Sequence, residues 1–203
     1  MKRMTRTQII NKFITKYNYK NYLELGLYKP EGNFTQIIAE HKTGVDPWTP
    51  LELYPEGAES NLMSSDTYFS QLDKDKKFDI IFIDGNHDEE FVDRDIVNSL
   101  KHLTEKGTLI MHDCNPPDRS CEGFRKGCGT VWKSFYKLRK NNLNLDTYVI
   151  DTDWGVGIVR GGVREDFIEL PESVLDYDFF DKNRDKILNL KTVQQFNTRF
   201  DLY

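Results

Sequence analysis

Two short apolar segments that end in polar residues constrain the fold of this chain most. Residues 78–83 run into Asp84-Gly85-Asn86-His87, and residues 107–111 run into His112-Asp113-Cys114-Asn115. Apolar runs of this length are typical of strands buried on both faces of a parallel sheet. A helical pattern lies between them, so the sequence predicts parallel neighbours joined by a right-handed crossover. Both polar clusters would then lie at the carboxyl edge of the sheet, where open α/β folds bind ligands.

Helical and strand-like patterns alternate along the rest of the chain. Helices are expected over residues 5–17, over 34–40 with Asn33 as the cap, from a cap at Ser65 or Asp66 through Leu72, and over 130–140. Further strands are expected over residues 21–25, 42–45, near 61–63, and over 147–150 and 155–159. This alternation predicts an α/β protein with a doubly wound, mostly parallel sheet of the seven-stranded type. Residues 161–203 are expected to be mostly helical.

Composition excludes several classes of protein. The net charge of -5 gives no basic bias for a nucleic-acid backbone, and no apolar run approaches the roughly 20 residues of a membrane span. Three cysteines, Cys114, Cys121 and Cys128, lie in one segment. Their odd number argues against a disulfide framework and predicts a reducing, cytoplasmic setting. Their spacing of seven residues does not fit a structural zinc site, whose ligands usually pair two to four residues apart.

The ends of the first two strands indicate a nucleoside site. Gly26 ends the first strand after Glu24-Leu25, and a glycine there allows a ligand to approach the backbone. Asp46 ends the second strand, where an acid can bind both hydroxyls of a ribose. The glycine-rich phosphate loop is missing, so a nucleoside without a pyrophosphate fits better than a dinucleotide. The alternative for Gly26 is an ordinary strand-to-helix turn.

Four segments together resemble a known family. They are Leu23-Glu24-Leu25-Gly26, Gly44-Val45-Asp46-Pro47, Phe82-Ile83-Asp84-Gly85-Asn86-His87 and His112-Asp113-Cys114-Asn115-Pro116-Pro117. In this order they resemble the motifs of class I S-adenosylmethionine-dependent methyltransferases, and most closely the small bacterial "methyltransferase domain 24" type. Residues 129–133 and 151–157 are similar to that group as well. The resemblance implies a methyltransferase domain over residues 1–160, with residues 161–203 as a helical extension packed on it.

The resemblance also implies roles for individual residues. Glu24, Gly26, Asp46 and Asp84 would serve the cofactor S-adenosylmethionine, with Ser65 or Asp66 near its adenine. Asp84, His112 and Asp113 match positions that hold a divalent ion, Mg²⁺ or Mn²⁺, in metal-dependent relatives. The alternative is that Asp84 and Asp113 only cap helices and bind the cofactor's ammonium group.

His87 follows Asp84 by three residues, so both side chains could face one site. The pattern resembles the Asp-x-x-His of sugar O-methyltransferases, which implies that His87 is the general base and that Asp84 assists it. The alternative is a histidine at a helix start, hydrogen-bonded to the backbone. Trp154 is a candidate for lining the acceptor pocket.

Taken together, these features predict methyl transfer to a hydroxyl of a sugar or other small molecule, in surface-glycan or secondary metabolism. Two alternatives stay open: a non-catalytic nucleoside-binding module of the same fold, and an NAD-dependent oxidoreductase, against which the missing glycine fingerprint argues. The expected partner is a small-molecule or glycan acceptor, with no nucleic acid and no membrane span. A homo-oligomer is left open.

Overall fold

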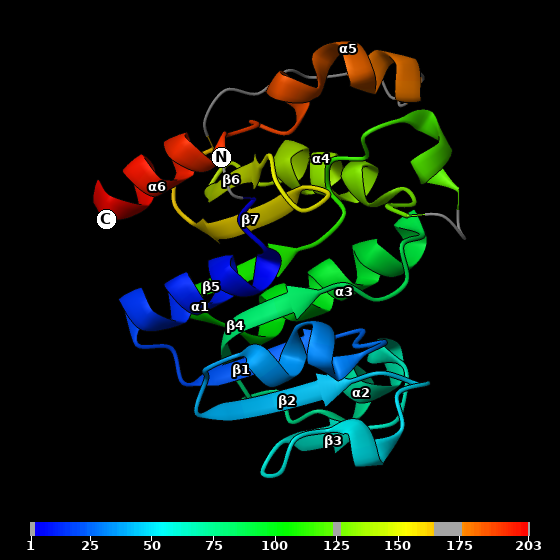
Figure 1. Ribbon diagram of the computed structural model, residues 1–203, viewed down its shortest axis with the longest axis vertical. Helices are drawn as coiled ribbons and strands as arrows, with labels where there is room; N and C mark the ends of the chain where they lie inside the picture. Colours follow the sequence, from blue (N-terminus) through cyan, green and yellow to red (C-terminus); the bar gives the residue numbers. More distant parts are fainter. Residues whose placement is uncertain (1–2, 124–126, 165–175, 203) are drawn as a thin grey trace. The chain divides into compact units, whose positions relative to one another are not determined.

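A seven-stranded sheet organises the chain, in the order β3-β2-β1-β4-β5-β7-β6 (Figure 1). The computed structural model describes residues 3–123, 127–164 and 176–202. The strands are β1 (Asn21–Leu25), β2 (His41–Val45), β3 (Glu59–Asn61), β4 (Phe78–Ile83), β5 (Leu103–Met111), β6 (Leu145–Ile150) and β7 (Val156–Gly161). β1 pairs in parallel with β2 and β4, and β2 with β3, whereas β6 and β7 are antiparallel. The predicted α/β fold with a sheet of this type is confirmed.

Six α-helices accompany the strands in the described residues. They are α1 (Arg6–Tyr17), α2 (Ser65–Gln71), α3 (Glu89–His102), α4 (Val131–Asn141), α5 (Tyr177–Ile187) and α6 (Val193–Leu202). Short 3-10 helices are η1 (Pro30–Gly32), η2 (Phe34–Gln36), η3 (Leu51–Leu53) and η4 (Arg119–Glu122). No helix among these residues is long and apolar enough to cross a membrane.

The chain divides into two compact units. The N-terminal unit comprises Thr5–Asn86 and Glu90–Ile110, and the C-terminal unit comprises Met1–Met4, His87–Glu89 and Met111–Tyr203. Each unit is described by itself. The boundary predicted after residue 160 remains a prediction.

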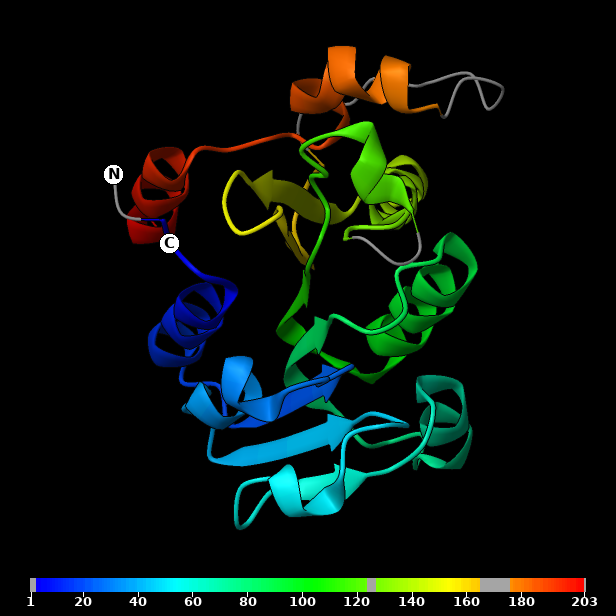
Figure 2. The same cartoon turned by 45° about the vertical axis from the view of Figure 1, so that its right-hand side comes forward.

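The N-terminal unit has helices on both sides of its strands. Figure 2 shows α1 on one side, with α2 and α3 on the other. α1 begins with a capping box, in which the Thr5 hydroxyl accepts from the Gln8 amide and the Gln8 side chain accepts from the Thr5 amide. Its apolar stripe is buried, and β4 is buried along nearly its whole length. α2 and α3 are joined by a stacked pair, Phe69 and His102, with ring centroids 5.5 Å apart.

The C-terminal unit is built on the β6–β7 hairpin. The segment between α5 and α6 runs beside β6, because the Val149 amide donates to the Leu188 carbonyl and the Lys191 amide to the Val149 carbonyl. Trp132 on α4 stacks on Phe180 of α5, with centroids 4.3 Å apart. These contacts tie α4 and α5 to the same hairpin.

Three local predictions need correction. Phe34–Gln36 is a single 3-10 turn and not a helix to residue 40, because the Asn33 side chain donates to Tyr22 and Glu24 instead of capping. The cap of α2 is Ser64, whose hydroxyl accepts from the Thr67 amide, and neither Ser65 nor Asp66. β5 begins at Leu103 rather than 107, so α3 passes into the strand without a separate loop.

Candidate active site

Asp46, the predicted ribose ligand, holds together the turns after β1 and β2. One carboxylate oxygen accepts from the amides of Leu27 (2.8 Å) and Tyr28 (3.1 Å), and the other from those of Trp48 (2.7 Å) and Thr49 (2.8 Å). Burial alone would raise the pKa of this carboxyl, but the four donors outweigh it and hold the pKa below its usual value. A ribose would have to share or displace these amides, so the first role of Asp46 in this structure is to shape the turn.

Position 26 requires a glycine because Gly85 lies directly against it. Its φ is +84°, and a Cβ at this position would lie 2.3 Å from the Cα of Gly85, after β4. The Gly26 amide donates to the Val45 carbonyl, and the Asp84 amide to the Leu25 carbonyl. The ends of β1, β2 and β4 therefore meet backbone to backbone, which only glycine permits here.

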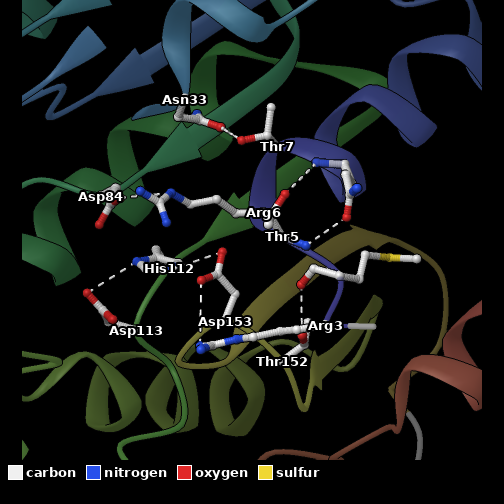
Figure 3. Close-up of polar contacts among 12 residues, drawn as sticks. Arg3, Thr5, Arg6, Thr7, Asn33, Asp84, His112, Asp113, Thr152 and Asp153 are labelled. Atoms are coloured by element: carbon white, nitrogen blue, oxygen red, sulfur yellow. Dashed lines mark hydrogen bonds and ion pairs between the residues drawn. The ribbon is translucent and has the colours of Figure 1, made fainter. Parts of the chain in front are cut away.

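Glu24 is the centre of a buried polar cluster. Its Oε2 accepts from the Tyr22 hydroxyl (2.5 Å) and from Asn33 Nδ2 (3.0 Å), and Asn33 Oδ1 accepts from the Thr7 hydroxyl of α1 (2.7 Å). Burial raises the pKa of Glu24 to about 8, with Asp84 adding to the rise and the two hydrogen bonds opposing it. Burial therefore favours the protonated form of Glu24. The hydrogen bond from Thr7 to Asn33 connects α1 to this cluster (Figure 3), and Asn33 in turn donates to Glu24 on β1.

Asp84 is paired with α1 within the N-terminal unit. Its Oδ2 lies 3.6 Å from Nε of Arg6, and the two side chains are 18% and 26% exposed (Figure 3). The sequence did not single out Arg6, because a lone arginine at a helix start gives no motif.

The residues predicted near the adenine are held by α3. Asp66 accepts from Nε of Arg94 at 3.1 Å, and Ser65 is hydrogen-bonded to the buried carboxyl of Asp95. Both side chains face the junction of α2 and α3, so a role beside the adenine stays a prediction.

In the C-terminal unit, Asp113 is surrounded by three side chains. Its Oδ2 lies 3.3 Å from Nε2 of His87 and 3.3 Å from Nδ1 of His112, and its Oδ1 accepts from the thiol of Cys128 at 3.5 Å. Asp113 has a φ of +58°, which is unusual for a residue other than glycine. Burial and the nearby carboxylate raise the pKa of Cys128, so its thiol keeps the proton that it donates.

The proton on His87 can be placed from its partners. Nδ1 lies 2.6 Å from the Gly127 carbonyl oxygen, which can only accept, so Nδ1 carries hydrogen. Nε2 then faces the Asp113 carboxylate, and a bare lone pair beside a carboxylate would be repelled. A proton taken up at Nε2, or a cation between these two atoms, would remove that repulsion, so Nε2 is a favourable place to accept a proton.

Gly129 and Thr130 fix the position of His87. The amide of Thr130 donates to the His87 carbonyl at 2.9 Å, and the Thr130 hydroxyl accepts from the Glu89 amide at 2.9 Å. A Cβ on Gly129 would lie 2.4 Å from the His87 carbonyl oxygen, so glycine is needed there. The Gly129-Thr130 motif thus orients the candidate base.

The donor atoms fit a divalent ion in part. Nε2 of His87 and Oδ2 of Asp113 lie 3.3 Å apart, close enough to share one ion, and the Nδ1–H···O=C bond is the usual support of a metal-bound histidine. His112 fits less well, because Asp113 lies beside its Nδ1 and Asp153 lies 3.9 Å from its Nε2 (Figure 3). His87 with Asp113 is therefore a better ligand pair than His112 with Asp113.

A cavity of about 980 Å³ opens in the C-terminal unit beside Asp153. Its wall includes Trp154, whose indole is 41% exposed, and Arg3, whose guanidinium lies 3.7 Å from Asp153. Asp153, Trp154 and Gly155 have φ values of 48°, 64° and 88° in succession. Strained backbone of this kind concentrates at binding sites. Trp154 therefore lines a cavity, as the sequence predicted.

A comparison with known families identifies part of the chain. Residues 23–114 match the model of a family described as "Methyltransferase domain". This segment, which is less than half of the chain, is similar to a methyltransferase domain. The resemblance to class I methyltransferases is thereby confirmed. No curated protein is similar enough in sequence to match.

Solved structures of low sequence identity share the fold of this chain. A putative caffeoyl-CoA O-methyltransferase from Staphylococcus aureus has 17% identity and a TM-score of 0.58, over 77% of this chain and 82% of that one. An O-methyltransferase from Bacillus cereus in complex with SAH has 12% identity and a TM-score of 0.58, over 78% and 82%. MycE methyltransferase from the mycinamycin biosynthetic pathway, in complex with Mg, SAH and mycinamycin VI, has 18% identity and a TM-score of 0.51, over 80% of this chain and 50% of that one.

Proposed function

We propose that this methyltransferase moves a methyl group from S-adenosylmethionine to a hydroxyl oxygen. The observation that carries the proposal is the His87–Asp113 pair, in a chain whose residues 23–114 match a methyltransferase domain. Methyltransferases of similar fold add support, two of them complexes with SAH. A nucleoside-binding module without chemistry would not need an imidazole oriented in this way.

His87 is the proposed base. S-adenosylmethionine, when bound, would supply a sulfonium methyl group for in-line transfer to an acceptor oxygen, with S-adenosylhomocysteine as the leaving group. The hydroxyl proton then passes to Nε2 of His87, where Asp113 stabilises the imidazolium at 3.3 Å. The Gly127 carbonyl keeps the ring in the required tautomer.

The acceptor is proposed to bind in the cavity beside Asp153. The charges on its wall are balanced, since Arg3 and Arg184 are matched by Asp151 and Asp153. An uncharged, hydroxyl-rich molecule fits such a wall better than a strongly ionic one, and Trp154 offers a flat apolar face to it. A sugar or similar small molecule is therefore the proposed acceptor, in glycan or secondary metabolism.

A divalent cation is the second candidate. Asp113 and His87 of the C-terminal unit would hold it. When bound, such an ion would lower the pKa of the acceptor hydroxyl. The magnesium in the MycE complex supports this candidate, whereas the Arg6 guanidinium beside Asp84 disfavours a second cation there.

Ligand binding tests the donor. S-adenosylhomocysteine is expected to bind the purified protein and to stabilise it by about 2.7 kcal/mol at a hundred times its dissociation constant. Calorimetry and thermal unfolding measure both quantities. Binding of NAD without binding of S-adenosylhomocysteine would instead support an oxidoreductase.

Trp154→Asn tests the acceptor site. Asparagine tolerates the left-handed backbone, so the change removes the indole and keeps the turn. KM for the acceptor is expected to rise about tenfold or more, while the affinity for S-adenosylhomocysteine is unchanged. Trp48→Asn, at an exposed tryptophan of the N-terminal unit, is the comparison. An unchanged KM in Trp154→Asn would move the acceptor elsewhere.

A further inference from the structure

The helices near the C-terminus supply part of the wall of the cavity beside Asp153. Arg184 of α5 and Asn197 of α6 line it, together with Asn115 from the loop after β5 and Asp151 from the loop after β6. All four residues belong to the C-terminal unit. The hydrogen-bonding capacity that these side chains have left determines which kind of molecule the wall can recognise.

Arg184, Asn115 and Asp151 form a chain of hydrogen bonds. Nη1 of Arg184 donates to Oδ1 of Asn115 at 2.6 Å, and Nδ2 of Asn115 donates to Oδ1 of Asp151 at 3.0 Å. Because a guanidinium can only donate, Arg184 fixes which end of the Asn115 amide faces Asp151. The backbone amide of Asn115 also donates to the Trp154 carbonyl at 2.9 Å. Asp151 is therefore held at one oxygen, beside the turn that carries Trp154.

The second oxygen of Asp151 has capacity to spare. Asp151 is exposed, and Asn115 is its one side-chain partner among the residues that the structure describes. An ionised carboxylate has about four acceptor sites, shared between two oxygens. Oδ2 of Asp151 can therefore accept hydrogen bonds from a molecule in the cavity.

The other groups of the wall also favour a ligand that donates hydrogen bonds. Oδ1 of Asn197 is buried and has no hydrogen-bond partner within residues 3–123, 127–164 and 176–202. The two arginines of the wall are already in ion pairs, Arg3 with Asp153 at 3.7 Å and Arg184 with Asp181. The cations are thus engaged while acceptor oxygens are left over, which suits hydroxyl groups better than an anion.

We propose that Asp151 recognises two neighbouring hydroxyl groups of a saccharide acceptor, and that Arg184 is the positioning residue that holds Asp151 through Asn115. Hydroxyls on adjacent ring carbons can both donate to one carboxylate, and such charge-assisted bonds are strong. The apolar C–H face of the same ring would pack on the indole of Trp154. The inference rests on the proposed function, since it assumes that the acceptor binds in this cavity.

Binding of simple glycosides tests the role of Asp151. The probes are methyl α-D-mannopyranoside, methyl β-D-galactopyranoside and the monodeoxy analogues of each, titrated by NMR in the presence of S-adenosylhomocysteine. Asp151→Asn is expected to weaken the bound glycoside about 10- to 100-fold, as for loss of hydrogen bonds to a charged group. A monodeoxy analogue that lacks one of the two recognised hydroxyls should bind weakly to the wild type and lose little more in the variant.

Arg184→Gln tests the positioning. It should weaken the glycoside in the wild-type background but not in the Asp151→Asn background, because Arg184 is proposed to act through Asp151. A residue that only stabilises the fold would weaken binding equally in both. Asp185→Asn makes the same change of charge as Asp151→Asn at an exposed position of α5 outside the cavity, and should change nothing. Circular dichroism and thermal unfolding check that each variant is folded.

The remaining outcomes separate this inference from the proposed function. Glycoside binding that Trp154→Asn weakens and Asp151→Asn leaves unchanged would overturn the role of Asp151 and keep the acceptor site. A protein that binds S-adenosylhomocysteine but neither glycoside would overturn the saccharide class and keep the methyl donor. A protein that binds neither S-adenosylhomocysteine nor a glycoside would overturn the proposed function, and this inference with it.

Discussion

Two glycines of the N-terminal unit show how much one residue can determine. Gly26 and Gly57 have nearly the same left-handed φ, +84° and +80°, but a Cβ would meet backbone at 2.3 Å in the first and nothing within 4 Å in the second. Gly57→Ala is expected to lower the free energy of unfolding by about 1–2 kcal/mol, the cost of left-handed backbone alone for a residue with a Cβ. Gly26→Ala should cost several times more, because the ends of β1 and β4 must separate. Urea unfolding without ligand measures both; equal losses would show that the contact with Gly85 yields easily.

His87 is the residue on which the proposed chemistry depends. His87→Ala should lower the rate of methyl transfer by about 10²–10⁴-fold, the usual contribution of positioned proton transfer. Its affinity for S-adenosylhomocysteine should stay near that of the wild type. Single-turnover kinetics and calorimetry separate the two effects. A variant with wild-type turnover would leave His87 as the helix-start residue of the alternative reading.

The residue types at the strand ends could be predicted from the sequence, but their partners could not. An acid after β2 or a histidine after β4 is visible as a motif. The bond from Thr7 to Asn33 joins residues 26 positions apart, and the one from Cys128 to Asp113 comes from a loop with no regular pattern. Such contacts depend on tertiary packing, which leaves no periodic signal in the chain.

Among the elements, the junction of α2 and α3 contains an ionisable group that is poorly solvated. Asp95 is 3% exposed, and burial raises the pKa of its carboxyl to about 6. The folded state therefore binds a proton more tightly than the unfolded state, whose pKa is about 3.9. Stability is lost as pH rises from about 4 to about 6, by about 1–3 kcal/mol in total.

Asp95→Asn should remove this pH dependence. The variant is expected to be more stable than the wild type at pH 7 and no more stable at pH 4, because the wild-type carboxyl is already protonated there. Denaturant unfolding across this pH range gives the curves. Asp93→Asn, on the same helix and less buried, is the control. A gain that is equal at both pH values would mean that solvation of Asp95 is not the cause.

Regular elements were predicted best where the pattern repeats. The apolar stripe of α1 and the buried run of β4 match the structure closely, because a helix or a buried strand is set mainly by local periodicity. The helix predicted after Asn33 does not form, because the Asn33 side chain makes tertiary hydrogen bonds instead of capping it. Nothing in the sequence indicated that Arg139 of α4 is wholly buried; its guanidinium donates to Thr147 and to the carbonyls of Lys186 and Ile187.

For the whole molecule, the open question is what lies between His87 and Asp113. If this place stays empty until Nε2 accepts the acceptor's proton, turnover persists in excess chelator, and this is the result that we expect. A cation would be indicated by loss of turnover that Mg²⁺ or Mn²⁺ restores, together with a rise in melting temperature on adding Mn²⁺. Asp113→Asn should abolish that rise, which separates binding at this pair from binding elsewhere.

The fold class followed from the alternation of strands and helices, which leaves few topologies open. The methyltransferase domain was implied by the resemblance of the motifs in their order. The division into two units could not be predicted from the sequence, since it depends on contacts between segments distant in sequence. Cytoplasmic location, acceptor identity and oligomeric state remain predictions or open alternatives at this scale.

The turn at residues 153–155, whose backbone is left-handed, has a consequence for how such enzymes diverge. A Cβ on Gly155 would lie 2.3 Å from the amide nitrogen of Asn115, so natural variation at this position is expected to be purged. The large, half-exposed side chain of Trp154 lines the cavity, and the close contact of Gly155 with Asn115 fixes the adjacent backbone. Descendants of one ancestor could therefore acquire new acceptors by exchanging this side chain while inheriting the turn unchanged.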